Sequence, residues 1–266
     1  METPALPATK VHLSRGQPTT NIISCMRAVL ADPNLSNASS VGGTDLGHGV
    51  HVNHLMLALH YPAMLYRADA HGDEMKGHIG ASEHSVPLRL KDLIHLGSTT
   101  FLGDSMEFFG VFRICGILKM PECFKAMKDA VDNFVEGSSL LVTLDSSSNA
   151  ILESRLVELY KQYPSRVPAG MFDVQFVCYK DDVSFPSVPS TFAQAHRLVL
   201  MAVSTYFSAL AKDDLACPWI IPSADVSPDV LHSVLTFLYT GRASVSIDRF
   251  VELAYQADGW QLHDLG

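Results

Sequence analysis

The sequence has no stretch that approaches the ~20 consecutive apolar residues needed to cross a bilayer. Its first ten residues, METPALPATK, also lack the apolar run of a secretory signal peptide. Lys and Arg number 19 against 28 Asp and Glu and form no dense stripe, so neither a nucleic acid nor a membrane is expected as a partner. Five cysteines occur without any Cys-x-x-Cys pair, which favours free thiols and a cytoplasmic or nuclear location.

Signatures of nucleotide or cofactor binding are also missing. The sequence contains no Gly-rich phosphate loop, Walker motif or dinucleotide fingerprint, and we expect no cofactor. It does contain 47% hydrophobic and 18% charged residues over a length of 266. This composition is typical of a globular protein with one large domain or two smaller ones.

The second half has the clearer pattern of secondary structure. Residues 173–178 alternate between the two faces of a strand with one buried face. A turn with a short strand is expected over 185–194, and PWIIP at 218–222 predicts another short strand. Residues 196–210 predict a single helix, with an apolar stripe of Leu200, Val203, Phe207 and Leu210.

Residues 228–240 form the best-marked predicted helix. Ser227 is its expected N-cap, Pro228 occupies the first helical position and Gly241 is the expected C-cap. The residues expected on its buried face are Leu231, Val234, Leu235 and Leu238. A further helix within 246–262 is expected to bury Phe250, Leu253, Ala254 and Ala257.

Six short motifs follow one another through residues 172–266. They are Asp173-Val174, Ala195-His196-Arg197, Ser204-Thr205-Tyr206-Phe207, Ser227-Pro228, Phe237 to Gly241, and Leu253 to Leu262. Their order and combined spacing resemble the BTB/POZ domain. The resemblance implies an α+β fold, with a short mixed sheet capped by a cluster of helices. The chain stops at Gly266, where the last helix of that family is expected to begin.

The resemblance also implies a function. BTB/POZ domains are non-catalytic protein–protein interaction modules that commonly pair with themselves, and many hold substrates for cullin-RING ubiquitin ligases. In members that dimerise, a charged pocket lies near the interface, and here it would be formed by Asp173, His196 and Arg197. The apolar-x-Glu motif that contacts cullin should lie between Leu210 and Trp219, but AKDDLACPW in that region has no Glu.

His196 could instead be considered for catalysis. Its neighbour Arg197 supplies neither a nucleophile nor an acid, so we expect a structural histidine whose ring packs under the sheet.

The first half repeats the pattern in a degenerate form. Three pairs of segments lie 142–144 residues apart: Leu57–Met64 with Leu200–Phe207, Leu93–Gly97 with Phe237–Gly241, and Cys115–Met120 with Ala257–Leu262. This near-constant separation predicts two related domains. Residues 121–136 resemble the closing BTB helix, whereas a clear opening strand is missing from the first copy. Pairing between two chains, which we favour, and pairing of the two halves of one chain both remain open.

The predicted organisation therefore has four parts. They are an N-terminal arm and loop at 1–47, a degenerate BTB-like domain at 48–136, a helical linker at 137–171, and a BTB/POZ domain at 172–266 that is truncated at its last helix. Residues 85–93 are left open between strand and helix, and Pro121 should separate two helices. The linker helix, at 150–163, is expected to place Ile151, Leu152, Leu156 and Leu159 on one face.

Three closely spaced histidines have the residue type of a metal site. His48, His51 and His54 are three residues apart, but the intervening Gly49 and valines favour a strand or loop, so no metal site is expected.

Gly103-Asp104-Ser105 resembles the nucleophile block of SGNH-type ester hydrolases, with Asp258 and His263 as a distant Asp/His block. The Gly and Asn blocks of that family are not found, and Ser105 is more simply the cap of a helix at 106–119. Ester hydrolysis is the alternative function.

Overall fold

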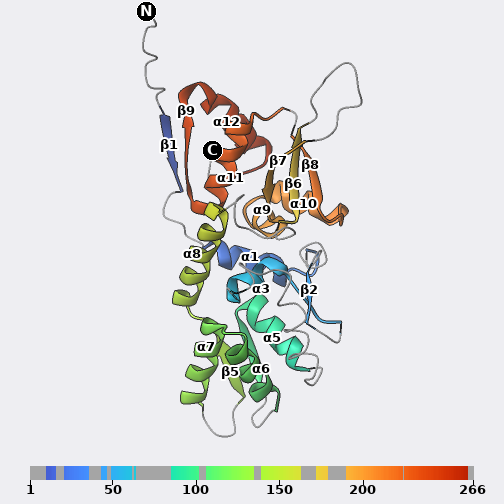
Figure 1. Ribbon diagram of the computed structural model, residues 1–266, viewed down its shortest axis with the longest axis vertical. Coiled ribbons are helices and arrows are strands. Elements are labelled where there is room, and N and C mark those ends of the chain that lie inside the picture. Colours follow the sequence, from blue (N-terminus) through green and yellow to red (C-terminus); the bar gives the residue numbers. More distant parts are fainter. Residues whose placement is uncertain are drawn as a thin grey trace, which may run out of the picture. The chain divides into compact units, whose positions relative to one another are not determined.

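The computed structural model describes residues 10–15, 21–35, 43–46, 49–61, 63, 85–101, 106–134, 139–162, 172–178, 190–223 and 225–262. These residues form two compact units (Figure 1). Unit 1 contains the first strand and the residues from 172 onward, and unit 2 contains residues 21–162. Within these described ranges no helix is long and apolar enough to span a membrane. Helices and small sheets are mixed in both units, as an α+β fold requires.

Unit 1 contains a mixed sheet of three strands. In chain order its elements are β1 (Lys10–Ser14), β6 (Val174–Cys178), β7 (Ser190–Ala195), α9 (Arg197–Val203), α10 (Thr205–Asp213), β8 (Trp219–Pro222), α11 (Pro228–Thr240), β9 (Arg242–Ser246), η2 (Ile247–Arg249) and α12 (Phe250–Gly259). Strand β6 lies between β7, to which it is antiparallel, and β8, to which it is parallel. The strands predicted at 173–178 and 218–222 are therefore present, and Val174 and Phe176 are fully buried.

The prediction of a single helix over 196–210 is wrong, because the helix is interrupted at Ser204. This residue is extended (φ −142°, ψ 123°), and its hydroxyl accepts a 3.1 Å hydrogen bond from the Phe207 N–H. The same hydroxyl donates to the carbonyl of Trp260 at 2.6 Å. Helix α10 consequently starts in a new direction, and Leu210 is 37% exposed instead of completing the apolar stripe.

Helix α11 has the predicted bounds. Pro228 is in its first turn, and Gly241 ends it in the left-handed region at φ 69°. Ser227 occupies the N-cap position, but its side chain makes no capping bond. Its N–H donates instead to Glu252 Oε1, at 2.6 Å.

The predicted core face of α11 is confirmed. Leu231, Leu235 and Leu238 are at most 2% exposed. Ser233 is buried as well, and its hydroxyl donates to the carbonyls of Asp229 and Ser244. The buried surface of α11 is therefore broader than its leucine stripe.

Helix α12 buries Leu253 and Ala257 as predicted, but Phe250 is 40% exposed. Phe250 is the first residue of the helix. Helical side chains lean toward the N-terminus, so this ring extends past the end of the core.

Unit 2 consists of helices with two short two-stranded sheets. In chain order its elements are α1 (Ile22–Ala31), β2 (Thr44–Asp45), β3 (His51–Val52), α3 (His54–His60), α5 (Ser85–Leu96), β4 (Ser98–Phe101), α6 (Met106–Ile117), α7 (Pro121–Asp132), β5 (Leu140–Thr143) and α8 (Ser146–Gln162). Residues 85–93 are thus helical, and Pro121 begins a new helix as predicted. Ile151 is 43% exposed, so its assignment to the buried face of α8 is wrong. It stands about 100° around the helix from buried Leu152.

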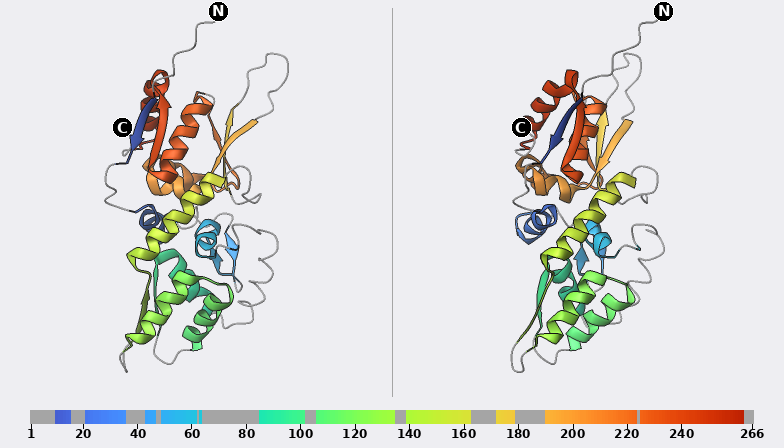
Figure 2. Two further views of the ribbon diagram at one scale, coloured as in Figure 1. Left: turned by 60° about the vertical axis from the view of Figure 1, so that its left-hand side comes forward. Right: turned by 90° about the vertical axis from the view of Figure 1, so that its left-hand side faces the viewer.

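Strands β1, β2, β4, β5 and β9 lie in segments that the sequence did not mark as strands, and for β1 and β5 another structure was expected. Residues 10–14, expected in a loose arm, form β1 and pair antiparallel with β9 (Figures 1 and 2). Residues 140–143, expected in a helical linker, form β5 and pair antiparallel with β4. Both are only four or five residues long. Their alternation was too short to stand out from the neighbouring Pro, Thr and Ser residues.

Helix α11 can be tested by a pair of substitutions. Leu235→Asp should destabilise unit 1 by about 4 kcal/mol or more, because it removes a buried side chain and buries a charge. His232→Asp, on the exposed side of the same helix, should have little effect. Urea unfolding followed by circular dichroism measures both variants, and equal midpoints would contradict the face assignment.

Candidate interaction site

His196 joins the start of α9 to α11. It is 1% exposed, its backbone N–H donates to the Tyr239 hydroxyl at 2.8 Å, and its Nδ1 lies 2.7 Å from the same oxygen. The imidazole ring also packs on Phe172, with the ring centroids 4.5 Å apart. The buried structural histidine expected from the sequence is present, and its ring lies within hydrogen-bond distance of a side-chain hydroxyl.

Arg197 follows it and is equally buried. Its guanidinium donates to the carbonyls of Asp214 and Ala216, and Cζ lies 4.9 Å from the centre of the Trp219 ring. The charge is therefore held by backbone oxygens and an aromatic face inside unit 1. This anchors the segment that leads from α10 to β8.

Asp173 meets Arg197 through the backbone. Its Oδ1 accepts from the Arg197 N–H at 2.6 Å, so the carboxylate caps the start of α9. Burial raises the pKa of the Asp173 carboxyl to about 6, against the opposing effect of that hydrogen bond and of the Arg197 charge. The three residues of the expected dimer pocket are thus brought together, although the guanidinium points elsewhere. Their role in dimerisation stays a prediction.

The raised pKa of Asp173 predicts a pH effect. A carboxyl that is harder to ionise in the folded state favours folding when protonated, so stability is lost as pH rises from about 4 to 6. Asp173→Asn keeps the acceptor and should gain on the order of 2 kcal/mol over wild type at pH 7, but nothing at pH 3.5. Urea unfolding at both pH values, with exposed Asp248→Asn as the control, tests this.

A similar contact occurs in unit 2, where sequence reasoning had not placed a site. Asn53 caps α3 through Oδ1, which accepts from the Met56 N–H at 3.1 Å. Its own N–H donates to His95 Nε2 on α5 at 2.9 Å. His95 therefore receives the first amide of a helix, as Tyr239 does in unit 1. The available signal was the spacing, since Asn53 and His95 lie 143 and 144 residues before His196 and Tyr239.

His95 must be neutral to accept this bond, and burial lowers its pKa to about 4. Stability that depends on the neutral ring is present above pH 6.5 and is lost as pH falls toward 4. His95→Gln retains an acceptor without titrating, so its stability relative to wild type should rise by on the order of 3 kcal/mol between pH 7 and 4. Urea unfolding at the two pH values measures this, and an unchanged difference in unfolding free energy between the variant and wild type would contradict it.

The metal alternative gains no support from the part of the chain that the structure describes. His48 lies outside the described residues. His51 is exposed on β3, and His54 Nδ1 lies 3.1 Å from Thr44 Oγ1. Among described residues no group of three His, Cys, Asp or Glu side chains could hold a metal ion.

The ester-hydrolase alternative has almost no described geometry. Gly103, Asp104, Ser105 and His263 lie outside the described residues, including the expected cap of α6. Asp258 is in the last turn of α12.

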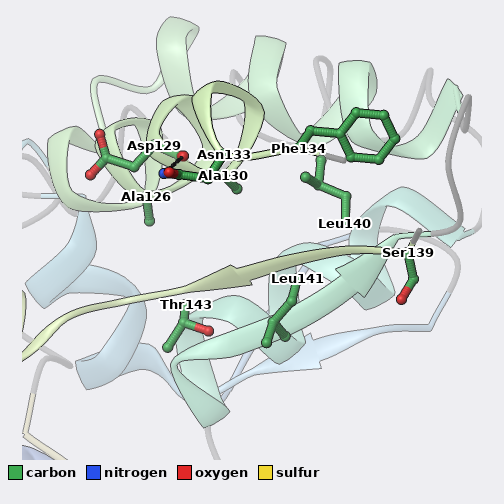
Figure 3. Close-up of a pocket in the computed structure, with 9 residues that line it drawn as sticks. All are labelled: Ala126, Asp129, Ala130, Asn133, Phe134, Ser139, Leu140, Leu141 and Thr143. Atoms are coloured by element: carbon green, nitrogen blue, oxygen red, sulfur yellow. Dashed lines mark hydrogen bonds between the residues drawn. The ribbon is translucent and has the colours of Figure 1, made fainter. Parts of the chain in front are cut away.

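A groove of about 350 Å³ lies between α7 and β5 (Figure 3). Ala126, Ala130 and Phe134 line it from the side of α7, and Leu140 points toward them from the strand. Leu141 points the other way and is 61% exposed. The alternation along β5 therefore holds one face of the strand against α7.

Comparison with known proteins identifies the C-terminal part. The three-stranded sheet, the helices α9 to α12 and the buried His196–Tyr239 contact define an α+β module. Residues 166–266 match the family model of the BTB/POZ domain. The "Longitudinals lacking protein-like" protein of Drosophila melanogaster is 34% identical over 83 residues. That alignment covers 30% of this chain and 65% of the relative.

Proposed function

We propose that this protein is a protein-interaction protein with two BTB-like units in tandem, the second clear and the first degenerate. The BTB/POZ domain at 166–266 supplies the interaction class. The single observation that carries the tandem is that unusual backbone features recur in unit 2 at matching positions. They are not features that composition alone would produce.

The first recurrence is at the end of the long helix. Gly97 follows α5 at φ 75° and Gly241 follows α11 at φ 69°, and a strand begins at the next residue in both units. Left-handed glycine is a common helix ending, so this feature by itself is weak.

The second recurrence is rarer. Lys119 and Gln261 have positive φ, 51° and 52°, a conformation that non-glycine residues seldom adopt. The amide after each returns to the preceding helix, from Met120 to the Cys115 carbonyl at 2.9 Å and from Leu262 to the Ala257 carbonyl at 2.8 Å. With the amide acceptors His95 and Tyr239, three local geometries recur 142–144 residues apart.

Self-association belongs to this proposal. Arg197 is engaged inside unit 1, so reversing its charge would test folding more than association. We propose pairing of the two halves of one chain, in place of the pairing between chains that the sequence favoured. Cytoplasm or nucleus is the proposed location, on the basis of the cysteines.

An adaptor role for a cullin-RING ubiquitin ligase is the finer part of the proposal. The family's contact segment would follow α10, where Leu215 is 54% exposed beside two aspartates. Asp213 and Asp214 precede Leu215, and Cys217 occupies the position two residues after it, where the motif has Glu.

Solution mass tests the function. The protein alone should behave as one chain of 29.0 kDa at tens of micromolar, and a cullin N-terminal domain should add one cullin per chain. Leu215→Ala should weaken that complex about tenfold, because a truncated exposed anchor loses on the order of 1.4 kcal/mol.

Ile247→Ala is the matched control, since Ile247 is 55% exposed on the 3-10 turn before α12. Absence of a cullin complex would exclude the adaptor role. A wild-type dimer would exclude the proposed pairing within one chain.

A further inference from the structure

Two strand pairs join segments that belong to different proposed repeats. Each proposed repeat begins with a strand and a helix, β1–α1 in the first and β5–α8 in the second. Each then continues through a hairpin and helices to a strand after a left-handed glycine, β4 in the first and β9 in the second. By position in the sequence, β1 and β4 belong to the first repeat and β5 and β9 to the second.

The observed pairs cross between the repeats. Strand β1 pairs with β9, and β5 pairs with β4. In the first pair Ser14 is opposite Arg242, and in the second Thr143 is opposite Ser98. Arg242 and Ser98 are the residues directly after the two left-handed glycines, so the two ladders have the same register.

The backbone amide that follows each opening strand makes the same hydrogen bond in both cases. The Arg15 N–H donates to the Gly241 carbonyl and the Leu144 N–H donates to the Gly97 carbonyl, each at 2.7 Å. One residue beyond the ladder, both opening strands are thus fixed to the turn that begins their partner. The two ladders therefore match in register, in this additional hydrogen bond and in its length, which indicates two examples of one docking geometry.

The helices that follow the two opening strands are in contact. Arg27 on α1 donates to the Asn149 side chain on α8, and Asn21, the cap of α1, donates to Glu153 on α8. Helix α8 is held further by Arg155, which forms two 2.7 Å hydrogen bonds with Glu122 on α7. The helices of the two opening segments, α1 and α8, are therefore joined to each other within unit 2.

The geometry points to a reciprocal strand exchange inside one chain. Strand β1 of the first repeat closes the β9 edge of the second repeat, and β5 of the second closes the β4 edge of the first. The chain is thereby its own partner at both edges. This inference rests on the proposed tandem and names the partner of those edges.

Two physical reasons favour exchange within the chain. An unpaired edge presents free N–H and C=O groups to any extended segment, so β4 and β9 must be covered. A tethered strand competes at an effective concentration on the order of millimolar, which a second chain reaches only at millimolar protein. Burial adds to the ladder, since Val245 on β9 is 4% exposed and Val142 on β5 is fully buried.

A cysteine pair across the ladder tests the exchange. His12 and Ser244 are opposite each other and exposed. Alternation from the Arg15 bond makes them a non-hydrogen-bonded pair, with Cα atoms about 4.5 Å apart, close enough for a disulfide. His12→Cys with Ser244→Cys would be made in full-length protein carrying Cys217→Ser, which removes an exposed native thiol. The protein would then be oxidised with oxidised glutathione.

The expected product is one disulfide within each chain. Non-reducing electrophoresis and mass spectrometry should give a single chain that has lost two thiols. Lys10→Cys with Ser244→Cys, displaced by two residues along the ladder, is the matched control and should cross-link at least tenfold less. The same design at the other edge uses Leu141→Cys with Thr100→Cys, also opposite each other and exposed.

Disulfide-linked dimers, or a 1:1 mixture of the two single-cysteine variants that cross-links, would show exchange between chains and overturn the inference. Failure of the facing pair to cross-link beyond its control would overturn it as well. These outcomes are independent of cullin. A chain that cross-links within itself but binds no cullin keeps the strand exchange and loses the adaptor role.

Discussion

The edges of two short strands constrain much of this structure. Strands β4 and β9 each begin directly after a left-handed glycine that ends a long helix. Without a partner strand, each would expose a row of backbone N–H and C=O groups. Neither has a partner from its own stretch of sequence in the ladders observed. Each is covered by a strand from elsewhere in the chain, β5 in one case and β1 in the other. The N-terminal segment is therefore part of the fold of unit 1, although some 230 residues separate it from β9 (roughly the length of two ordinary domains).

Buried polar groups supply the second layer of specificity. In unit 1 the Tyr239 hydroxyl, the Asp173 carboxylate and two backbone carbonyls satisfy the groups around His196 and Arg197. In unit 2 His95 and Asn53 fulfil the corresponding task at the start of α3. Buried groups of this kind set geometry because leaving one unpaired costs about 1–3 kcal/mol. An arginine so engaged is poorly placed to act as a charged contact for a second chain.

The candidate site illustrates how far sequence reasoning could go. Asp173, His196 and Arg197 were grouped by resemblance, and they do lie together. The structure adds the direction of the Arg197 guanidinium, since sequence cannot tell whether it reaches a carboxylate or turns to nearby carbonyls. The break at Ser204 was missed for a related reason. The Ser204 hydroxyl both accepts from the Phe207 N–H and donates to the Trp260 carbonyl, and the sequence does not show that Trp260 lies beside it.

Local chemistry determined much of this protein from the sequence itself. The bounds of α11 follow from Pro228 and Gly241, the strand at β6 from its alternation, and the BTB/POZ character of the second half from the spacing of its motifs. Tertiary structure alone decided the partners of β1 and β5. A strand of four or five residues has no stability by itself, and its ladder depends on which distant edge is open. That information belongs to pairs of segments far apart in the chain, and no single segment contains it.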